Sequence, residues 1–221
     1  MKTTWSLLIK RGLGFNMAIK TFEYCSLFYL NQWLEYDMGF CDALAKGTRS
    51  KKLDTLRKAG NFYRVARNLP SKYEGGLKRY ELVLDIIDFL NPADFKKDPI
   101  EKIHKVKDEI SSKYGERGVL SLTTKFLWIK LKEPILIYDS QARIALGIKS
   151  EDLGSYYKKW RKEFEANKTA IVAACSQLPD MYKYAANQEI GTREYIGEIA
   201  STTWFYERVF DAYLWHKGKN P

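Results

Sequence analysis

The sequence has little of what metal chemistry and oxidative folding require. Only three cysteines and two histidines occur in 221 residues, and no two cysteines form a CxxC pair. The two histidines, His104 and His216, are far apart in the chain, and no HExxH motif or acidic calcium loop is present. We therefore expect no metal, no cofactor and three free thiols in a reducing compartment, which points to the cytoplasm.

A long apolar segment is also lacking. The short run from Trp5 to Ile9 is followed by Lys10 and Arg11, and it is too short for a secretion signal or a membrane span. We expect no membrane partner. Residues 1–16 are interpreted as an N-terminal extension, and residues 17–221 as a single helical domain.

Alternating patterns typical of strands are scarce, whereas apolar residues recur at spacings of three and four along most of the chain. This periodicity predicts a mainly α fold. The cap residues, glycines and prolines that punctuate it predict helices over residues 21–38, 50–69, 77–90, 99–114, 119–131, 139–147, 151–176 and 192–217.

What the chain has in excess is positive charge. Lysine and arginine outnumber acidic residues by ten overall, and by eleven to two between Lys46 and Tyr80. Such a concentration favours a polyanionic partner, and we expect double-stranded DNA; a solvated helix face is the alternative. The candidate DNA-binding residues on the predicted helix 50–69 and its end are Lys51, Lys52, Arg57, Lys58, Arg64 and Arg67.

One segment, from Gly115 to Arg143, combines features that suggest chemistry. A turn containing Gly115 and Gly118 precedes an apolar helix that carries Lys125. A short extended run then leads to Asp139, which lies at the start of the next helix. Backbone N–H groups at a helix start hold a carboxylate and favour its ionised form.

This segment resembles the 8-oxoguanine-glycosylase-like branch of the helix-hairpin-helix DNA glycosylases. The run Ile137-Tyr138-Asp139-Ser140-Gln141-Ala142-Arg143 resembles that family's aspartate motif, and residues 204–211 resemble bacterial proteins of this branch. Two residues separate the hairpin glycines where the family has one, and the interval from Lys125 to Asp139 is shorter than the family's.

The resemblance implies a helical two-lobed bundle of the helix-hairpin-helix glycosylase type. It implies that Asp139 and Lys125 are catalytic and that the hairpin binds DNA through Gly115, Arg117 and Gly118. The base pocket that it implies contains Tyr138, Trp128, Gln141 and Arg143.

The residue types suit that chemistry. Breaking an N-glycosidic bond builds positive charge on the sugar, which a fixed carboxylate stabilises or traps by activating water. A lysine in apolar surroundings loses its proton more easily and attacks as an amine. The target base must leave the duplex to be reached, and aromatic side chains would receive it.

Simpler interpretations stand beside these. Asp139 is also an ordinary N-cap, and Lys125 a lysine whose stem is buried. Arg143 lies one turn beyond Asp139 and is placed to pair with it. Core packing is the alternative for Tyr138 and Trp128, and helix termination for the two glycines.

Three functions are therefore compared: a DNA glycosylase that excises a modified or damaged base, a non-catalytic DNA-binding module of the same fold, and a basic helical protein-interaction domain. We favour the glycosylase, in DNA repair or in defence against phage. The residues leave open which base is removed, whether strand cleavage follows, and the oligomeric state.

Overall fold

Helices supply all the regular secondary structure in the part of the chain that this computed structural model describes, residues 20–70 and 77–219. The expectation of a mainly α fold is confirmed. The α-helices are α2 (Phe22–Gln32), α3 (Met38–Lys46), α4 (Arg49–Phe62), α5 (Glu81–Ile87), α6 (Pro99–Lys113), α7 (Leu120–Leu131), α8 (Ser140–Ala145), α9 (Leu153–Ser176), α10 (Arg193–Ala200) and α11 (Thr203–Lys219). A π-helical turn, η1 (Trp33–Asp37), and three 3₁₀ segments, η2 (Ala66–Asn68), η3 (Pro92–Phe95) and η4 (Leu178–Tyr184), complete them.

The boundary expected between residues 16 and 17 lies outside the described residues. Within them, no helix is both long and apolar enough to cross a bilayer.

The first predicted helix continues further than expected. Thr21 caps it, its side chain accepting the N–H of Tyr24 at 3.3 Å. The chain then passes through η1 directly into α3 and stays helical to Lys46, because this stretch contains no proline and Asp37, at the junction, makes no side-chain cap bond. The prediction that this helix ends at residue 38 was wrong.

The second predicted helix is shorter than expected. It begins at Arg49 after the Thr48 cap and ends at Phe62 instead of residue 69. The chain leaves the helix through Arg64, which has a left-handed φ of 57°. The Val65 N–H then bonds the Gly60 carbonyl at 2.9 Å, the closing pattern of a helix C-terminus.

The last predicted helix, 192–217, is two helices. Between α10 and α11 the Thr202 hydroxyl donates to the Ile199 carbonyl at 2.7 Å, and the Ser201 hydroxyl donates to that of Glu198 at 2.8 Å. Short hydroxyl side chains that bond nearby carbonyls compete with helix continuation, and the chain bends there.

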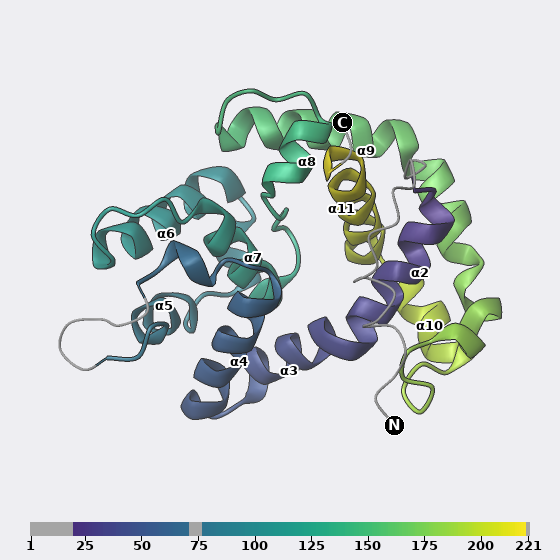
Figure 1. Cartoon of the computed structure of the whole chain (residues 1–221), viewed down its shortest axis with the longest axis horizontal. Coiled ribbons are helices and arrows are strands. Elements are labelled where there is room, and N and C mark those ends of the chain that lie inside the picture. The colour runs from purple at the N-terminus through teal and green to yellow at the C-terminus, as the bar shows by residue number, and fades with distance from the viewer. Residues whose placement is uncertain (1–19, 71–76, 220–221) are drawn as a thin grey trace, which may run out of the picture.

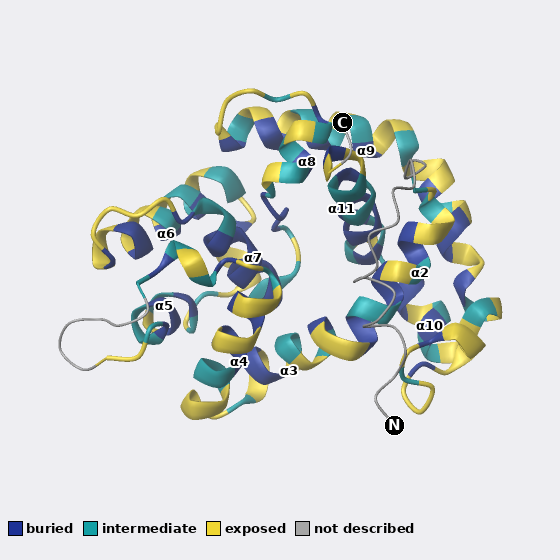
Figure 2. Cartoon of the chain, viewed as in Figure 1, coloured by how far each residue is buried: buried dark blue, intermediate teal, exposed yellow. Residues whose placement is uncertain are grey.

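The described helices form two groups (Figure 1). In the first, α3, α4, α5, α6 and α7 pack against one another. In the second, α2, α8, α9 and α10 surround α11. Figure 2 shows α11 mostly buried or half-buried in the middle of its group, with exposed residues on the outer turns of α9.

Two connections join the groups. One is the continuous helix α2–η1–α3, and the other is the link 132–139, which runs from the end of α7 to the start of α8. All residues of α7 from Leu122 to Ile129 are buried, because this helix contacts α3, α4 and α6. The candidate site lies where the second connection enters α8.

Candidate functional site

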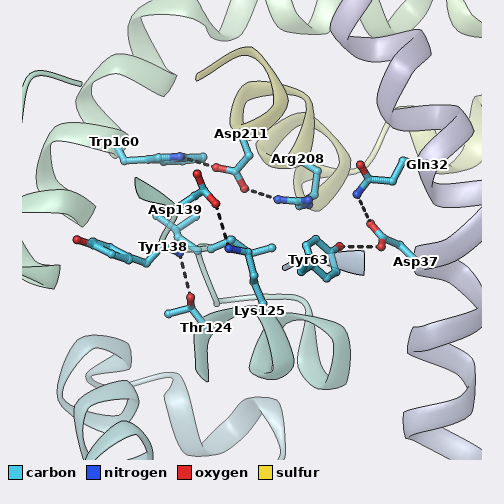
Figure 3. Close-up of polar contacts among 12 residues, drawn as sticks. Gln32, Asp37, Tyr63, Thr124, Lys125, Tyr138, Asp139, Trp160, Arg208 and Asp211 are labelled. Atoms are coloured by element: carbon cyan, nitrogen blue, oxygen red, sulfur yellow. Dashed lines mark hydrogen bonds and ion pairs between the residues drawn. The ribbon is translucent and has the colours of Figure 1, made fainter. Parts of the chain in front are cut away.

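Lys125 lies in the middle of α7 with only 6% of its side chain exposed. Its ammonium donates to the Ser121 hydroxyl at 2.8 Å, one turn earlier on the same helix. It also donates to Asp139 Oδ2 at 3.0 Å (Figure 3). The two residues that the sequence singled out for chemistry are therefore in direct contact.

Asp139 is the N-cap of α8. Its Oδ1 accepts the N–H of Gln141 at 2.9 Å, while Oδ2 accepts from Lys125. Its side chain keeps 24% of its surface exposed, four times the fraction of Lys125. A ligand that approaches from solvent therefore meets the carboxylate before the amine.

The link before Asp139 is held by hydrogen bonds from both sides. The Tyr138 N–H donates to Thr124 Oγ1 of α7 at 3.1 Å, and the Leu136 N–H donates to the Tyr157 hydroxyl of α9 at 2.8 Å. Residues 135–138 are all buried. Because α7 and α9 both anchor this link, the position of the carboxylate at its end is set by the packing of two helices.

Burial and pairing act in opposite directions on both charges. Burial alone would raise the pKa of Asp139, but the Lys125 ammonium and the amides of Gln141 and Ala142 outweigh it and lower that pKa. For Lys125, burial is the largest effect and lowers the pKa, although Asp139 opposes it. The ion pair thus joins a stabilised carboxylate to a lysine that releases its proton more readily than usual.

A second polar network, which the sequence analysis does not predict, lies beside the pair. Asp211 of α11 accepts from the indole of Trp160 at 2.8 Å and from Arg208 at 2.7 Å (Figure 3). The Arg208 guanidinium lies 4.9 Å from the ring centre of Trp128 and 5.1 Å from that of Tyr29. The signal for this network in the sequence is that Arg208 and Asp211, three residues apart, interrupt the apolar pattern of residues 204–214.

The same network continues into the first group of helices. Asp37 is fully buried and accepts from the Tyr63 hydroxyl at 2.7 Å and from Gln32 at 3.0 Å. Burial raises the pKa of Asp37, while Arg208 and these hydrogen bonds oppose the rise. Polar side chains thus extend from Asp139 to Asp37 across the region where the two groups meet (Figure 3).

The residues expected to form a base pocket are not gathered into an open pocket. Trp128 is 1% exposed and lies under Arg208, and Tyr138 is 5% exposed and packs against Tyr156. Both are core residues here, as the simpler interpretation has it. Gln141 contributes its N–H to the Asp139 carboxylate.

Arg143 does not pair with Asp139, the pairing that its position one turn further on allowed. Its guanidinium donates to the carbonyls of Ile148 at 3.3 Å and Lys149 at 2.7 Å. It thus closes the turn after α8 and leaves the carboxylate to Lys125.

The glycine hairpin ends α6 and lies beside the basic region. Gly115 has a φ of 74°, and the Glu116 N–H bonds the Ser111 carbonyl at 3.0 Å, which closes the helix. The Gly118 carbonyl accepts from Asn68 Nδ2 at 3.0 Å, so the hairpin is adjacent to η2. Gly115 therefore terminates α6. Arg117, in the same turn, is exposed near the basic residues that follow α4.

The basic residues of α4 divide into paired and unpaired ones. Lys52 pairs with Asp88 at 2.6 Å, and Arg57 and Lys58 both pair with Asp54 at 2.7 and 2.8 Å. Three of the expected DNA-binding residues are exposed and have no ion-pair partner in the described part of the chain: Lys51, Arg64 and Arg67.

Among the described residues, neither of two surface hollows is lined by Lys125 or Asp139. The larger, of about 560 Å³, lies between Leu34, Glu35 and Tyr36 on one side and residues 186–189 on the other. The smaller, of about 310 Å³, lies among α8, α9 and α11.

Comparison with known proteins gives no relative: no family model, no curated protein and no solved structure matches the chain. Across residues 20–70 and 77–219, no three His, Cys, Asp or Glu side chains cluster closely enough to hold a metal ion.

Proposed function

We propose that this protein is a DNA glycosylase that excises a modified or damaged base by cleaving its N-glycosidic bond. The observation that carries the proposal is the contact of 3.0 Å between the buried ammonium of Lys125 and the partly exposed carboxylate of Asp139. The order of α6, a glycine turn, α7, an extended link and a capping aspartate also supports a helix-hairpin-helix glycosylase type of fold.

Asp139 is the group proposed to act on the sugar. When the bond between C1′ and the base nitrogen breaks, the electron pair leaves with the base and positive charge develops on the sugar ring. A carboxylate held ionised by Lys125 and by the α8 amides stabilises that charge, or takes a proton from the water that attacks C1′. The products are the free base and an abasic site.

Lys125 offers a second route through the same pair. If its ammonium gives a proton to the Asp139 carboxylate, the free amine attacks C1′ itself. The base again leaves with the bonding electrons, and the amine nitrogen becomes bonded to the sugar. Opening of the sugar then gives an imine, which borohydride reduces to a stable link between protein and DNA. Trapping by borohydride therefore distinguishes this route from attack by water, in which no link forms.

Double-stranded DNA is the proposed partner. Lys51, Arg64, Arg67 and Arg117 are exposed, and the hydrogen bond from Asn68 to Gly118 holds η2 against the glycine turn that contains Arg117. Exposed arginines and lysines bind backbone phosphates without reading the base sequence, which suits an enzyme that must search along DNA for rare bases.

Base release from defined duplexes tests the proposal. The duplexes carry oxidised, alkylated, deaminated or hypermodified bases, and alkali reveals the abasic sites. Asp139→Asn keeps a capping side chain but removes the charge, so we expect release to fall at least about a hundredfold. The matched control is Asp152→Asn, which changes the N-cap of α9 in the same way and should leave release intact.

The other outcomes assign the alternatives. Salt-sensitive DNA binding without release from any duplex would identify a non-catalytic DNA-binding module. Absence of DNA binding would leave a helical domain whose basic surface meets an acidic protein. Equal release by Asp139→Asn and the native protein would remove Asp139 from the mechanism.

A further inference from the structure

An exposed pair of stacked aromatic rings lies away from Lys125 and Asp139. Tyr36 of η1 and Phe62 of α4 stack with ring centres 4.6 Å apart and an angle of 29° between their planes. Tyr36 is 42% exposed and Phe62 36%, and Phe40 meets Phe62 edge-on at 6.0 Å. Adjacent large rings that stay exposed together are characteristic of a binding surface rather than of a core.

Two sequence neighbours, the buried Asp37 and the half-buried Tyr63, hold this pair in place. Asp37 and Tyr63, each next in sequence to one of the rings, join η1 to the end of α4 through their 2.7 Å hydrogen bond. Their side chains point toward each other beside Arg208 (Figure 3), whereas Tyr36 and Phe62 are exposed. The bond between these neighbours fixes the two backbones, so the stacked rings are preorganised for a ligand.

Tyr36 also forms part of the larger hollow. Phe62 stacks on its ring, and Tyr36 lines the open hollow of about 560 Å³ together with Asn187 and Gln188. The far wall is anchored, because Asn31 bonds the backbone of Tyr184 at 3.3 Å and of Ala186 at 2.7 Å. The site thus offers an aromatic platform beside a formed hollow with amide side chains.

The charges around the platform define its ligand. Glu35 and Glu189 line the hollow and repel a phosphate or an acidic peptide from it. Arg64, which is exposed, lies two residues beyond Phe62, and Arg67 follows at η2. A ligand for this site must therefore avoid placing negative charge in the hollow and must offer negative charge to the arginines. A flat uncharged ring attached to an anionic backbone does both, because the ring stacks while the backbone contacts the arginines.

We propose that Tyr36 and Phe62 form a platform that stacks an unpaired base of the bound DNA. The inference rests on the proposed function only in taking DNA as the partner. It adds that the protein prefers DNA in which one base lacks its partner, and that this preference arises outside the Lys125–Asp139 pair.

Fluorescence of 2-aminopurine, which falls when the base stacks, tests the platform. The base is placed either opposite thymine or opposite an abasic analogue in otherwise identical duplexes, and affinity is measured by anisotropy on the same samples. We expect fluorescence to fall on binding only for the unpaired base. Tyr36→Leu and Phe62→Leu should each weaken binding of that duplex by about fivefold to a hundredfold and leave binding of the paired duplex nearly unchanged.

Two kinds of control accompany these variants. Tyr36→Phe and Phe62→Tyr keep an aromatic face and should retain the preference. Phe89 is a matched exposed ring outside the platform: it is 86% exposed and follows Asp88, which pairs with Lys52 in the first half of α4. Phe89→Leu should therefore leave the affinity for both duplexes and the fluorescence change as they are in the native protein. Thermal melting of each variant verifies that it is folded.

Equal affinity for both duplexes, or full fluorescence change in both leucine variants, would overturn the platform, as would absence of DNA binding. Base release is a separate readout. Release without a preference for the unpaired base supports the proposed function and refutes the platform. A preference for the unpaired base without release from any duplex supports the platform and refutes the proposed function.

Discussion

At the scale of single residues, the environment of Asp139 decides what its carboxylate can do. It lies at a helix start, next to a buried ammonium, with one edge open to solvent. The amides and Lys125 stabilise the charge that burial opposes, so the carboxylate stays ionised near neutral pH. Its contribution to stability is present above the pKa of the unfolded chain and is lost as pH falls through the lower pKa of the folded state.

Lys125→Met removes the ammonium, so that only the α8 amides still oppose the rise that burial causes in the pKa of Asp139. We expect the pKa of Asp139 to rise, so that its charge and its stability contribution are lost at a higher pH than in the native protein. A carbon-13 NMR titration of the aspartate carboxyls, with Asp139→Asn to assign the resonance, measures this directly.

Lys130→Met is the matched control, because Lys130 is a second lysine of α7, half-buried, that pairs with Asp88 at 3.3 Å instead. It should leave the Asp139 titration where it is. An unchanged Asp139 pKa in Lys125→Met would mean that the ion pair does not set the charge of the site.

At the scale of elements, two helix ends place the functional side chains. The end of α4 depends on Arg64, which adopts the left-handed conformation that glycine normally supplies. An L-residue in that conformation costs roughly 1–2 kcal/mol. The chain tolerates this cost at a position where the side chain is exposed and positively charged.

Arg64→Gly should therefore separate stability from DNA binding. We expect the free energy of unfolding to increase by about 1 kcal/mol because the strain is relieved, while DNA affinity falls because a cation is lost. Urea unfolding and DNA titration measure the two effects. Arg64→Ala, which loses the charge but keeps the strain, should weaken binding without the gain, and a loss of stability in Arg64→Gly would contradict this account.

The packing of α11 on α8 is the second such element. A Cβ at Gly218 would lie 1.8 Å from the carbonyl oxygen of Gln141, two residues after Asp139. Gly218→Ala must therefore push α8 away, and we expect about 1–3 kcal/mol of destabilisation together with a loss of base release. Thermal melting and the release assay test this.

Gly39→Ala provides the comparison. Gly39 lies within α3, and a Cβ there meets no other atom within 4 Å. We expect a gain of about 0.5–1 kcal/mol, because alanine loses less backbone entropy than glycine in a helix interior. Equal effects of the two substitutions would show that close approach at Gly218 does not position α8.

At the scale of the whole molecule, the excess of ten positive charges predicts the salt dependence of DNA binding. Lys51→Ala and Arg67→Ala should each reduce the slope of log affinity against log salt by about 1, since these side chains have no acidic partner among the described residues. Lys52→Ala should chiefly lower stability, because Lys52 pairs with Asp88. Affinities measured from 50 to 300 mM salt distinguish the two classes.

Much of the helical framework follows from local sequence signals. Asp98 and Pro99 mark the start of α6, and the apolar run of α7 predicts its burial. Three errors concern helix ends: the first helix continues past residue 38, the second ends near Arg64 without glycine or proline, and hydroxyl side chains divide the last at Thr202. Backbone conformations of this kind depend on hydrogen bonds that periodicity does not reveal.

The candidate site divides in the same way. Asp139 stands out as a cap because its role is local, and Lys125 stands out because a charge within an apolar run is unusual. The sequence does not predict the polar contacts of Arg208 and Asp211, because their partners Trp128 and Trp160 lie far away in the chain. The same is true of Tyr36 and Phe62, whose stacking joins two helices.

The sequence by itself determined that this protein is mainly helical, strongly basic, and equipped with a lysine and an aspartate on successive helices. These properties depend on composition and on spacings of a few residues. Only the tertiary structure decided that Lys125 and Asp139 touch, that Arg143 closes a turn instead, and which cations of α4 are unpaired. Those outcomes depend on contacts between distant segments, which form only when the helices pack.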